Sequence, residues 1–293
     1  MFPLQRFLAV GTGMGRTASV FGMPAESVAE VICRDVLFAH WPIDPTKLRS
    51  VVPSALTVDT FDETAWVSIV VVDIAEARVQ GVPYRPSLPS INLRTYVSLD
   101  GEPGVYFISL EMDGRLSAWV ARNGFGLPYH NATVNTTEQG GTLSVRSYRE
   151  RGAQPAAEFE ATYEPATDAP PVEADPETRE AFLIERTNYY FEATEELRRT
   201  GRLLDTTEFD GHSPSPSPSP PAGSPAPMVA GAATHDPWPL LPVEAEITAN
   251  TLFEAATVPV PDASPIFHYS RQQHMAAERL REVSSPVASS SGD

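Results

Sequence analysis

The sequence has almost no lysine and almost no cysteine. Lys47 is the only lysine among 21 basic residues, and Cys33 is the only cysteine. A single cysteine excludes any disulfide within the chain and fits a reducing compartment, so we expect a cytoplasmic protein. No stretch approaches the roughly 18 consecutive apolar residues that a membrane span needs.

Common cofactor and catalytic motifs are missing as well. The sequence contains no GxGxxG, P-loop, GxSxG or HExxH pattern. Of the six histidines, only His268 and His274 are close together, and their spacing matches no usual pair of metal ligands. We therefore expect neither a cofactor nor a metal site.

The charge balance is strongly acidic. Acidic residues number 38 against 21 basic ones, for a net charge of -17. This excess argues against a nucleic-acid partner, whose phosphates need basic side chains. Together with the scarcity of lysine, it predicts a salt-adapted, halophilic source, because counterions screen the self-repulsion of such a surface.

Low-complexity stretches mark what lies outside the expected core. We interpret residues 1–27 as a flexible leader, or as residues ahead of a start at Met14 or Met23. The Ser-Pro repeats of residues 212–227 cannot bury apolar surface, so we expect residues 211–233 to be a loop insertion. One domain then spans residues 28–283, and residues 284–293 form a disordered tail.

Most of the remaining sequence alternates like strands. Three hairpins are predicted: "LTVDTF" with "AWVSIVVVDI", "INLRTYVSL" with "VYFISLEM", and "TLSVRSY" with "AEFEATYE". Asp-Pro pairs predict short helices at Asp44 and Asp175, and apolar spacing predicts a third over residues 113–124. The expected fold is α+β, mainly antiparallel β, with a curled or closed sheet.

Several residues could carry chemistry. Arg34 and Arg94 stand in strands among apolar neighbours, so each must face solvent, pair with a carboxylate or grip an anionic ligand. Glu111 could act as a general acid or base with Arg115 holding it ionised, or form a surface ion pair. "GFGLPYHNA" presents Tyr129 and His130, which both handle protons, side by side.

The order of segments resembles the acetoacetate-decarboxylase-like superfamily, and within it the uncharacterised YqjF-like family. The segments "RDVLFAHWPIDPTKLRSVVPSALTVDTFDETAWVSIV", "INLRTYV", "GEPGVYFISLEMDGRLSAWVARNGFGLPYHNA", "FLIERTNYYF", "HDPWPLLPVEAEI" and "PIFHYS" carry this resemblance. It implies antiparallel strands curled around a central cavity with a few short helices.

The resemblance also bears on mechanism. The decarboxylase forms a Schiff base through a lysine pair that falls here on Tyr129 and His130, and neither residue can form one. Arg34 matches the cavity arginine of the decarboxylase, and Arg94 matches a recurrent family position. Ser90 stands where family members commonly carry a glutamate.

Three functions remain open at this point. The first is a cavity that binds a small anionic organic ligand, possibly a carboxylate, through charge, hydrogen bonds and an apolar wall; its residues would be Arg34, Arg94, Arg115, Trp119, His235 and Trp238. The second is a lyase- or hydrolase-like enzyme acting on a keto or hydroxy acid, with His130 as general acid or base and Tyr129 or Glu111 assisting. The third is a protein-interaction module with a filled interior.

Overall fold

The computed structural model describes residues 27–79, 82–84, 88–114, 127–152, 154–193 and 227–283. In this part of the chain fifteen strands form one sheet, accompanied by three short helices. The strands are β1 (Ser27–Ile43), β2 (Thr57–Val58), β3 (Ala65–Val79), β4 (Val82–Tyr84), β5 (Leu88–Leu99), β6 (Glu102–Asp113), β7 (Tyr129–Gln139), β8 (Thr142–Arg149), β9 (Ala157–Pro165), β10 (Asn188–Glu192), β11 (Met228–His235), β12 (Leu240–Leu241), β13 (Val243–Asn250), β14 (Ile266–Glu278) and β15 (Arg281–Val283). The helices are a 3₁₀ helix at Pro45–Leu48, α2 (Arg179–Ile184) and α4 (Leu252–Ala255).

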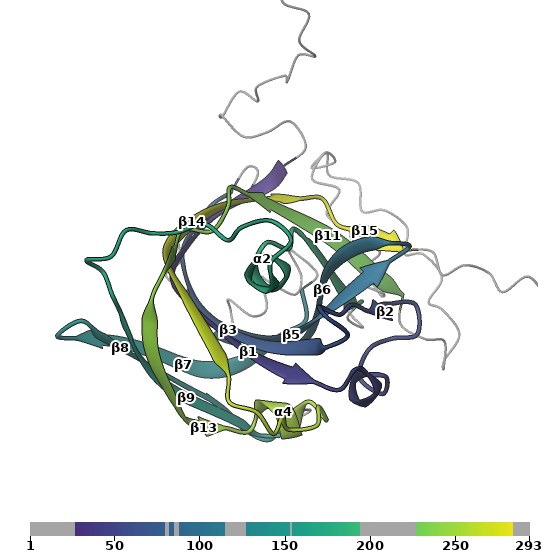
Figure 1. The fold of residues 1–293 in the computed structure, drawn as a ribbon, viewed down its shortest axis with the longest axis horizontal. Helices are drawn as coiled ribbons and strands as arrows, with labels where there is room; N and C mark the ends of the chain where they lie inside the picture. The colour runs from purple at the N-terminus through teal and green to yellow at the C-terminus, as the bar shows by residue number, and fades with distance from the viewer. Residues whose placement is uncertain are drawn as a thin grey trace, which may run out of the picture.

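Seven of the strands close into a barrel. The pairing runs β6-β10-β11-β14-β1-β3-β5, and β5 pairs back onto β6. Figure 1 shows this ring with α2 inside it. Most ladders are antiparallel, but β10 and β7 both run parallel to β6, so the sheet is mixed. The predicted sheet-dominated fold with few short helices is confirmed.

β6 divides the sheet into two parts. Its residues Gly104–Tyr106 pair with β10 of the barrel, whereas Leu110–Asp113 pair with β7. From β7 the sheet continues through β8 and β9 to β13. These four strands form a second layer below the ring in Figure 1. The molecule therefore has an outer core between barrel and second layer and an inner core within the barrel.

Bulges adjust which side chains reach the inner core. One extra residue is inserted in β1 after Arg34, one in β3 at Ala75 and one in β6 at Ile108. A bulge of this kind bends a strand and breaks the strict alternation of its two faces. Residues three apart consequently face the same side: Cys33 with Val36, Ile74 with Ala77, and Phe107 with Leu110.

Local patterns gave several elements correctly. The hairpins β5–β6 and β8–β9 form as expected, and Asp44 caps the 3₁₀ helix by accepting from the backbone N–H of Thr46 at 2.8 Å. The turn expected at Asp62-Glu63 forms and is closed by an antiparallel bridge between Phe61 and Thr64. The longer hairpin expected there does not form, because β2 pairs with β5 and not with β3. The helix predicted over residues 113–124 lies, apart from its first two residues, outside the described part of the chain.

The predicted insertion extends too far. Residues 228–233 belong to β11, which pairs with β10 and buries Met228, Val229 and Ala230 in the barrel wall. These apolar residues follow the Ser-Pro repeats directly, so composition alone did not show the boundary. Residues 211–226, like 1–26 and 284–293, lie outside the described part. Ser27, the last residue of the predicted leader, begins β1.

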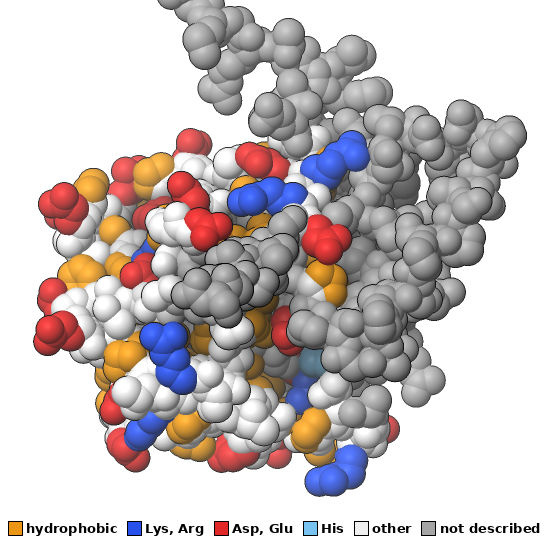
Figure 2. Space-filling model, turned by 90° about the vertical axis from the view of Figure 1, so that its right-hand side faces the viewer, with side chains coloured by type: hydrophobic (Ala, Val, Ile, Leu, Met, Phe, Trp, Pro, Cys, Tyr) orange, Lys and Arg blue, Asp and Glu red, His pale blue; other side chains and the backbone are white. Residues whose placement is uncertain are grey.

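The surface of the described residues reflects the composition. Acidic side chains are spread over the face shown in Figure 2 and do not gather in one patch. No helix in the described ranges is both long and apolar enough to cross a membrane.

Candidate functional site

A pocket of about 260 Å³ is bounded by side chains from all seven barrel strands. Most of its wall is apolar, with valine, leucine and alanine side chains and the aromatic residues Phe38, Phe107, Tyr189 and Trp238. Bulges in β1, β3 and β6 bring these side chains to one surface. An apolar pocket with a few polar groups is the usual form of a small-molecule site.

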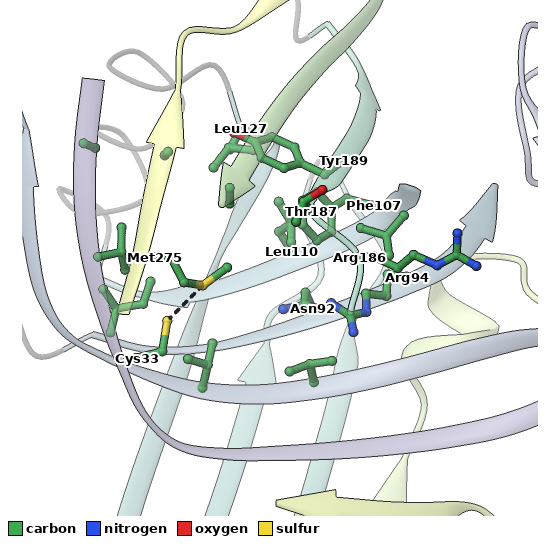
Figure 3. Close-up of a pocket in the computed structure, with 18 of the residues that line it drawn as sticks. Cys33, Asn92, Arg94, Phe107, Leu110, Leu127, Arg186, Thr187, Tyr189 and Met275 are labelled. Atoms are coloured by element: carbon green, nitrogen blue, oxygen red, sulfur yellow. Dashed lines mark hydrogen bonds between the residues drawn. The ribbon is translucent and has the colours of Figure 1, made fainter. Parts of the chain in front are cut away.

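The polar groups are unevenly distributed in the pocket. In Figure 3, Arg94 and Arg186 lie on one side and Cys33 and Met275 on the other. The Cys33 thiol donates a weak hydrogen bond to Met275 Sδ at 3.8 Å. Burial, reinforced by the charge of Asp73, raises the pKa of this thiol to about 12, so Cys33 is no thiolate nucleophile near neutral pH.

Arg94 brings a positive charge to the pocket that the described residues leave uncompensated. Its Nη2 donates to the backbone oxygen of Leu183 at 3.3 Å, and its guanidinium lies 5.7 Å from the ring centre of Phe38. Its Nε is buried without a hydrogen-bond partner. Among the described residues, no carboxylate forms an ion pair with it, which is unusual because a desolvated guanidinium needs an anion.

Arg186, by contrast, is fully engaged. Its Nη2 pairs with Asp59 Oδ2 at 2.9 Å, and its Nε donates to the backbone oxygen of Phe182 at 2.9 Å. The ring of Phe182 lies 4.3 Å from its guanidinium. The charge of Arg186 is therefore neutralised by the protein itself, whereas Arg94 has no carboxylate partner among the described residues. The pocket wall also includes Glu278 and Arg279 at the end of β14.

Tyr129 and His130 do not act as a pair. Tyr129 lines the pocket, where burial raises the pKa of its phenol despite a hydrogen bond with Ser90. Ser90 donates its own hydrogen to the backbone oxygen of Glu111, so the Tyr129 hydroxyl donates to Ser90 and can offer a ligand its oxygen as an acceptor. His130 is not part of the pocket wall, because alternation along β7 directs it to the other face, beside Glu111 in the parallel ladder.

Glu111 also lies outside the pocket. It is buried in the outer core, where it accepts from Ser109 Oγ at 2.9 Å and pairs with Arg149. Burial raises the pKa of its carboxyl, although Arg149 and Ser109 oppose this shift. Arg115, its expected partner, is outside the described residues. Glu111 is therefore not part of the pocket wall, and its assistance to a reaction stays a prediction.

The structure does not place Arg34 in the pocket either. Its side chain is exposed, and its Nε donates to Gln272 Oε1 at 3.3 Å. The bulge in β1 explains the difference, since Cys33 and Val36 on either side of it face inward while Arg34 faces out.

The remaining predicted ligand-binding residues divide. Trp238 lines the pocket and packs edge-on against Phe38 at 5.0 Å between ring centres. His235 contacts Trp238 but lines a different, polar depression of about 440 Å³, and its Nδ1 donates to the backbone oxygen of Asp236. Trp119 is outside the described residues.

Sequence reasoning missed several pocket residues. Arg186 and Tyr189 come from the segment "FLIERTNYYF", and their only signal was charge and aromaticity just before a strand. Asn92 lies two residues before Arg94 and so shares its face of β5. Within the described ranges, no cluster of three or more His, Cys, Asp or Glu residues could hold a metal ion.

Comparisons with known proteins agree on family and fold. Residues 32–203 match DUF2071, described as an uncharacterized conserved protein. The uncharacterized protein YqjF of Bacillus subtilis (strain 168) is 33% identical over 253 residues, which cover 85% of this chain and 90% of that protein.

Solved structures with the same fold are much more distant in sequence. Acetoacetate decarboxylase from Legionella pneumophila aligns with a TM-score of 0.56 at 14% identity, covering 96% of this chain and 100% of that one. An acetoacetate decarboxylase-like enzyme from Sphingomonas wittichii RW1 has a TM-score of 0.56 at 10% identity, over 89% and 95%. The enduracididine biosynthesis enzyme MppR, complexed with pyruvate, has a TM-score of 0.54 at 12% identity, over 94% and 99%. The fold is thus acetoacetate-decarboxylase-like, and the chain belongs to the DUF2071 family of uncharacterized conserved proteins.

Proposed function

We propose that the barrel pocket is a central binding cavity for a small organic monoanion with a largely hydrocarbon body. The single observation that carries this proposal is Arg94, a half-buried guanidinium that lines an apolar pocket without a carboxylate partner among the described residues. A bound carboxylate would supply the missing charge and accept the unused Nε hydrogen.

Pocket volume supports a ligand of about ten non-hydrogen atoms. An apolar cavity of about 150 Å³ accommodates benzene, which has six carbons. At the same volume per atom, 260 Å³ corresponds to about ten atoms. Octanoate and phenylacetate both have this size, a single negative charge and an apolar body that suits the wall.

The chain argues against Schiff-base chemistry in this pocket. Its only lysine, Lys47, lies in the 3₁₀ helix, with a side chain 47% exposed and 3.9 Å from Asp262. No lysine amine is therefore present at the pocket, where such chemistry would require one. We accordingly propose ligand binding without an imine intermediate.

Fold relatives are consistent with an anionic ligand. MppR structures hold pyruvate in one case and HEPES buffer in another; pyruvate carries a carboxylate and HEPES a sulfonate group near neutral pH. These observations concern MppR, and they support only the class of ligand proposed for this chain.

The other two functions receive less support. An acid–base role for His130 lacks a route to the ligand, since Tyr129 rather than His130 lines the pocket. A purely structural interaction module would have a filled interior, and the pocket of about 260 Å³ among the barrel side chains supports ligand binding instead.

Isothermal titration calorimetry with octanoate and phenylacetate tests the proposal on the full-length protein. We expect both to bind, and Arg94→Gln to weaken binding about 10- to 150-fold, because hydrogen bonds to charged groups contribute about 1.5–3 kcal/mol. Arg34→Gln is the matched control, since it removes the same charge from the exposed face of the same barrel.

Neutral octanamide tests the requirement for charge with nearly the same shape. We expect octanamide to bind the native protein more weakly than octanoate does. The Arg94→Gln variant should bind octanamide and octanoate with about equal affinity. Equal affinities of the native protein for acid and amide, or equal effects of the two arginine substitutions, would contradict the proposal.

A further inference from the structure

A buried polar chain lies directly behind the Arg94 end of the pocket. His40 of β1 is 0% exposed and stacks beside the pocket residue Phe38, with 6.0 Å between ring centres. Its Nδ1 lies 2.7 Å from Ser68 Oγ, which lies 2.8 Å from the hydroxyl of Tyr96. That hydroxyl in turn lies 2.8 Å from the backbone oxygen of Leu183, which also accepts from Arg94.

The number of hydrogens that these hydroxyl groups can donate determines which nitrogen of His40 carries its hydrogen. A carbonyl oxygen only accepts, so the Tyr96 hydroxyl must donate to Leu183. Ser68 must then donate its one hydrogen to Tyr96, which leaves His40 Nδ1 as the donor to Ser68. His40 therefore carries its hydrogen on Nδ1, and its Nε2 presents a lone pair.

This Nε2 is a buried base without a partner. It has no hydrogen bond in the structure, and neither has Nδ1 of His268, a residue of β14. The two rings are in contact, with centres 5.3 Å apart. The ring planes are tilted by 58° to each other, and neither nitrogen has the other as a hydrogen-bond partner.

Charged and titratable groups approach the pair from β5 and from α2. Arg94 and Tyr96 face it from β5, and Arg179 and Glu180 face it from α2, where they pair with each other at 2.8 Å. Arg186, next to Tyr96, is neutralised by Asp59. Burial is the main reason why the pKa of His40 lies well below its ordinary value, and His268, Arg94 and Arg179 add to this effect. Burial likewise lowers the pKa of His268.

An anion at Arg94 changes this balance. It would offset the positive charge that disfavours a proton on His40, while leaving the hydrogen-bond chain intact. We propose that anion binding at Arg94 is coupled to proton uptake by His40, which takes a proton from solvent on Nε2, the ring nitrogen that has no hydrogen-bond partner. This inference rests on the proposed function and adds that the pocket binds a carboxylate together with a proton.

Thermodynamic linkage between proton and anion binding gives the direction in which octanoate affinity should change with pH. If the occupied protein holds the proton more tightly than the empty one, the proton must equally tighten anion binding. Octanoate affinity should therefore rise as pH falls from 7.5 to 5.5, by at most about tenfold per pH unit for one proton. Octanoate itself stays ionised over most of this range.

Calorimetry of the full-length protein with octanoate, in buffers of different ionisation enthalpy, measures the proton taken up. Uptake and pH dependence should both disappear in His40→Asn, whose amide can still donate to Ser68 but cannot titrate. Octanamide should show no proton uptake. Octanoate binding with no proton uptake in the native protein would overturn the coupling while leaving the proposed function standing.

A second measurement needs no ligand. Arg94→Gln removes the same charge that a bound anion would offset, so the pKa of His40, followed by ¹⁵N NMR of the imidazole nitrogens, should rise. Arg34→Gln should leave it unchanged. If octanoate fails to bind at any pH, the proposed function fails, and the NMR result still decides the coupling: an unshifted His40 in Arg94→Gln overturns it.

Discussion

Two arginines, one in each core of the molecule, differ in whether the described residues supply a carboxylate partner. Arg149 is 5% exposed in the outer core, where it pairs with Glu111 and donates to Ser109 and to the backbone oxygen of Pro155. Arg94 lines the barrel pocket, where it has a backbone acceptor and aromatic neighbours but no carboxylate among the described residues.

The difference lies in where the anion comes from. In the outer core, Glu111 of β6 supplies the carboxylate that neutralises Arg149, so this ion pair is part of the folded structure. In the barrel the chain supplies a pocket instead. A cation held in apolar surroundings without a counter-charge is costly, and such sites are often functional. The comparison predicts that the same substitution will act on stability in one core and on ligand binding in the other.

The largest expected effect comes from Arg149→Gln. It leaves Glu111 buried and unpaired, which should lower the free energy of unfolding by about 3–5 kcal/mol at pH 8 in urea denaturation. Arg146→Gln is the control: Arg146 forms an exposed pair with Glu160 in the same β8–β9 hairpin, and its loss should change stability by about 0–1 kcal/mol.

The pH dependence of this variant gives a further test. Because burial raises the pKa of Glu111 above that of the unfolded chain, the folded state binds the extra proton as pH falls. The loss of stability should thus be smaller at pH 5 than at pH 8. A loss that is constant or larger at pH 5 would mean that the cost does not arise from the Glu111 charge.

An intermediate effect is expected from Gly231→Ala, which alters the pocket without touching either arginine. Gly231 pairs with Tyr189, and a β-carbon added there would lie 2.5 Å from the tyrosine hydroxyl oxygen. Tyr189 lines the pocket, so displacing its ring should cost about 1–3 kcal/mol of stability and weaken octanoate binding.

Gly152→Ala is the matched control for this change, since a β-carbon there meets nothing within 4 Å. Unchanged octanoate affinity in the Gly231→Ala protein, measured by the same calorimetry, would show that Tyr189 does not bound the ligand.

The sequence was informative where structure is local. The turn after β5 and the cap at Asp44 depend on adjacent residues, and both formed as expected. The strand arginines show the limit. The sequence left open whether Arg34 and Arg94 face solvent, a carboxylate or a ligand. Strict alternation could not decide this, because it does not locate the bulge after Arg34, which turns this residue outward.

Glu111 and His130 lie outside the pocket wall for a related reason. Each stands one residue away from a pocket residue, and a shift of one position along a strand reverses the face. The fork of β6 between β10 and β7, which creates the outer core around Glu111, joins segments far apart in the sequence. Such pairing carries no local signal, so no reading of "YFISLEM" alone could assign Glu111 to a structural ion pair.

The smallest effect on stability should come from Arg94→Gln, and it separates the two arginines most directly. The variant loses one hydrogen bond to Leu183, worth about 1 kcal/mol, but also removes an uncompensated charge, so the unfolding free energy should change by less than about 1 kcal/mol. The two proteins should differ clearly in how much octanoate stabilises them. Octanoate at 100 times its Kd should stabilise the native protein by about 2.7 kcal/mol, and the same concentration should stabilise Arg94→Gln far less. Urea denaturation with and without octanoate measures both quantities. An Arg94→Gln protein destabilised as strongly as Arg149→Gln would mean that Arg94 holds the barrel together, and the distinction between the two cores would fail.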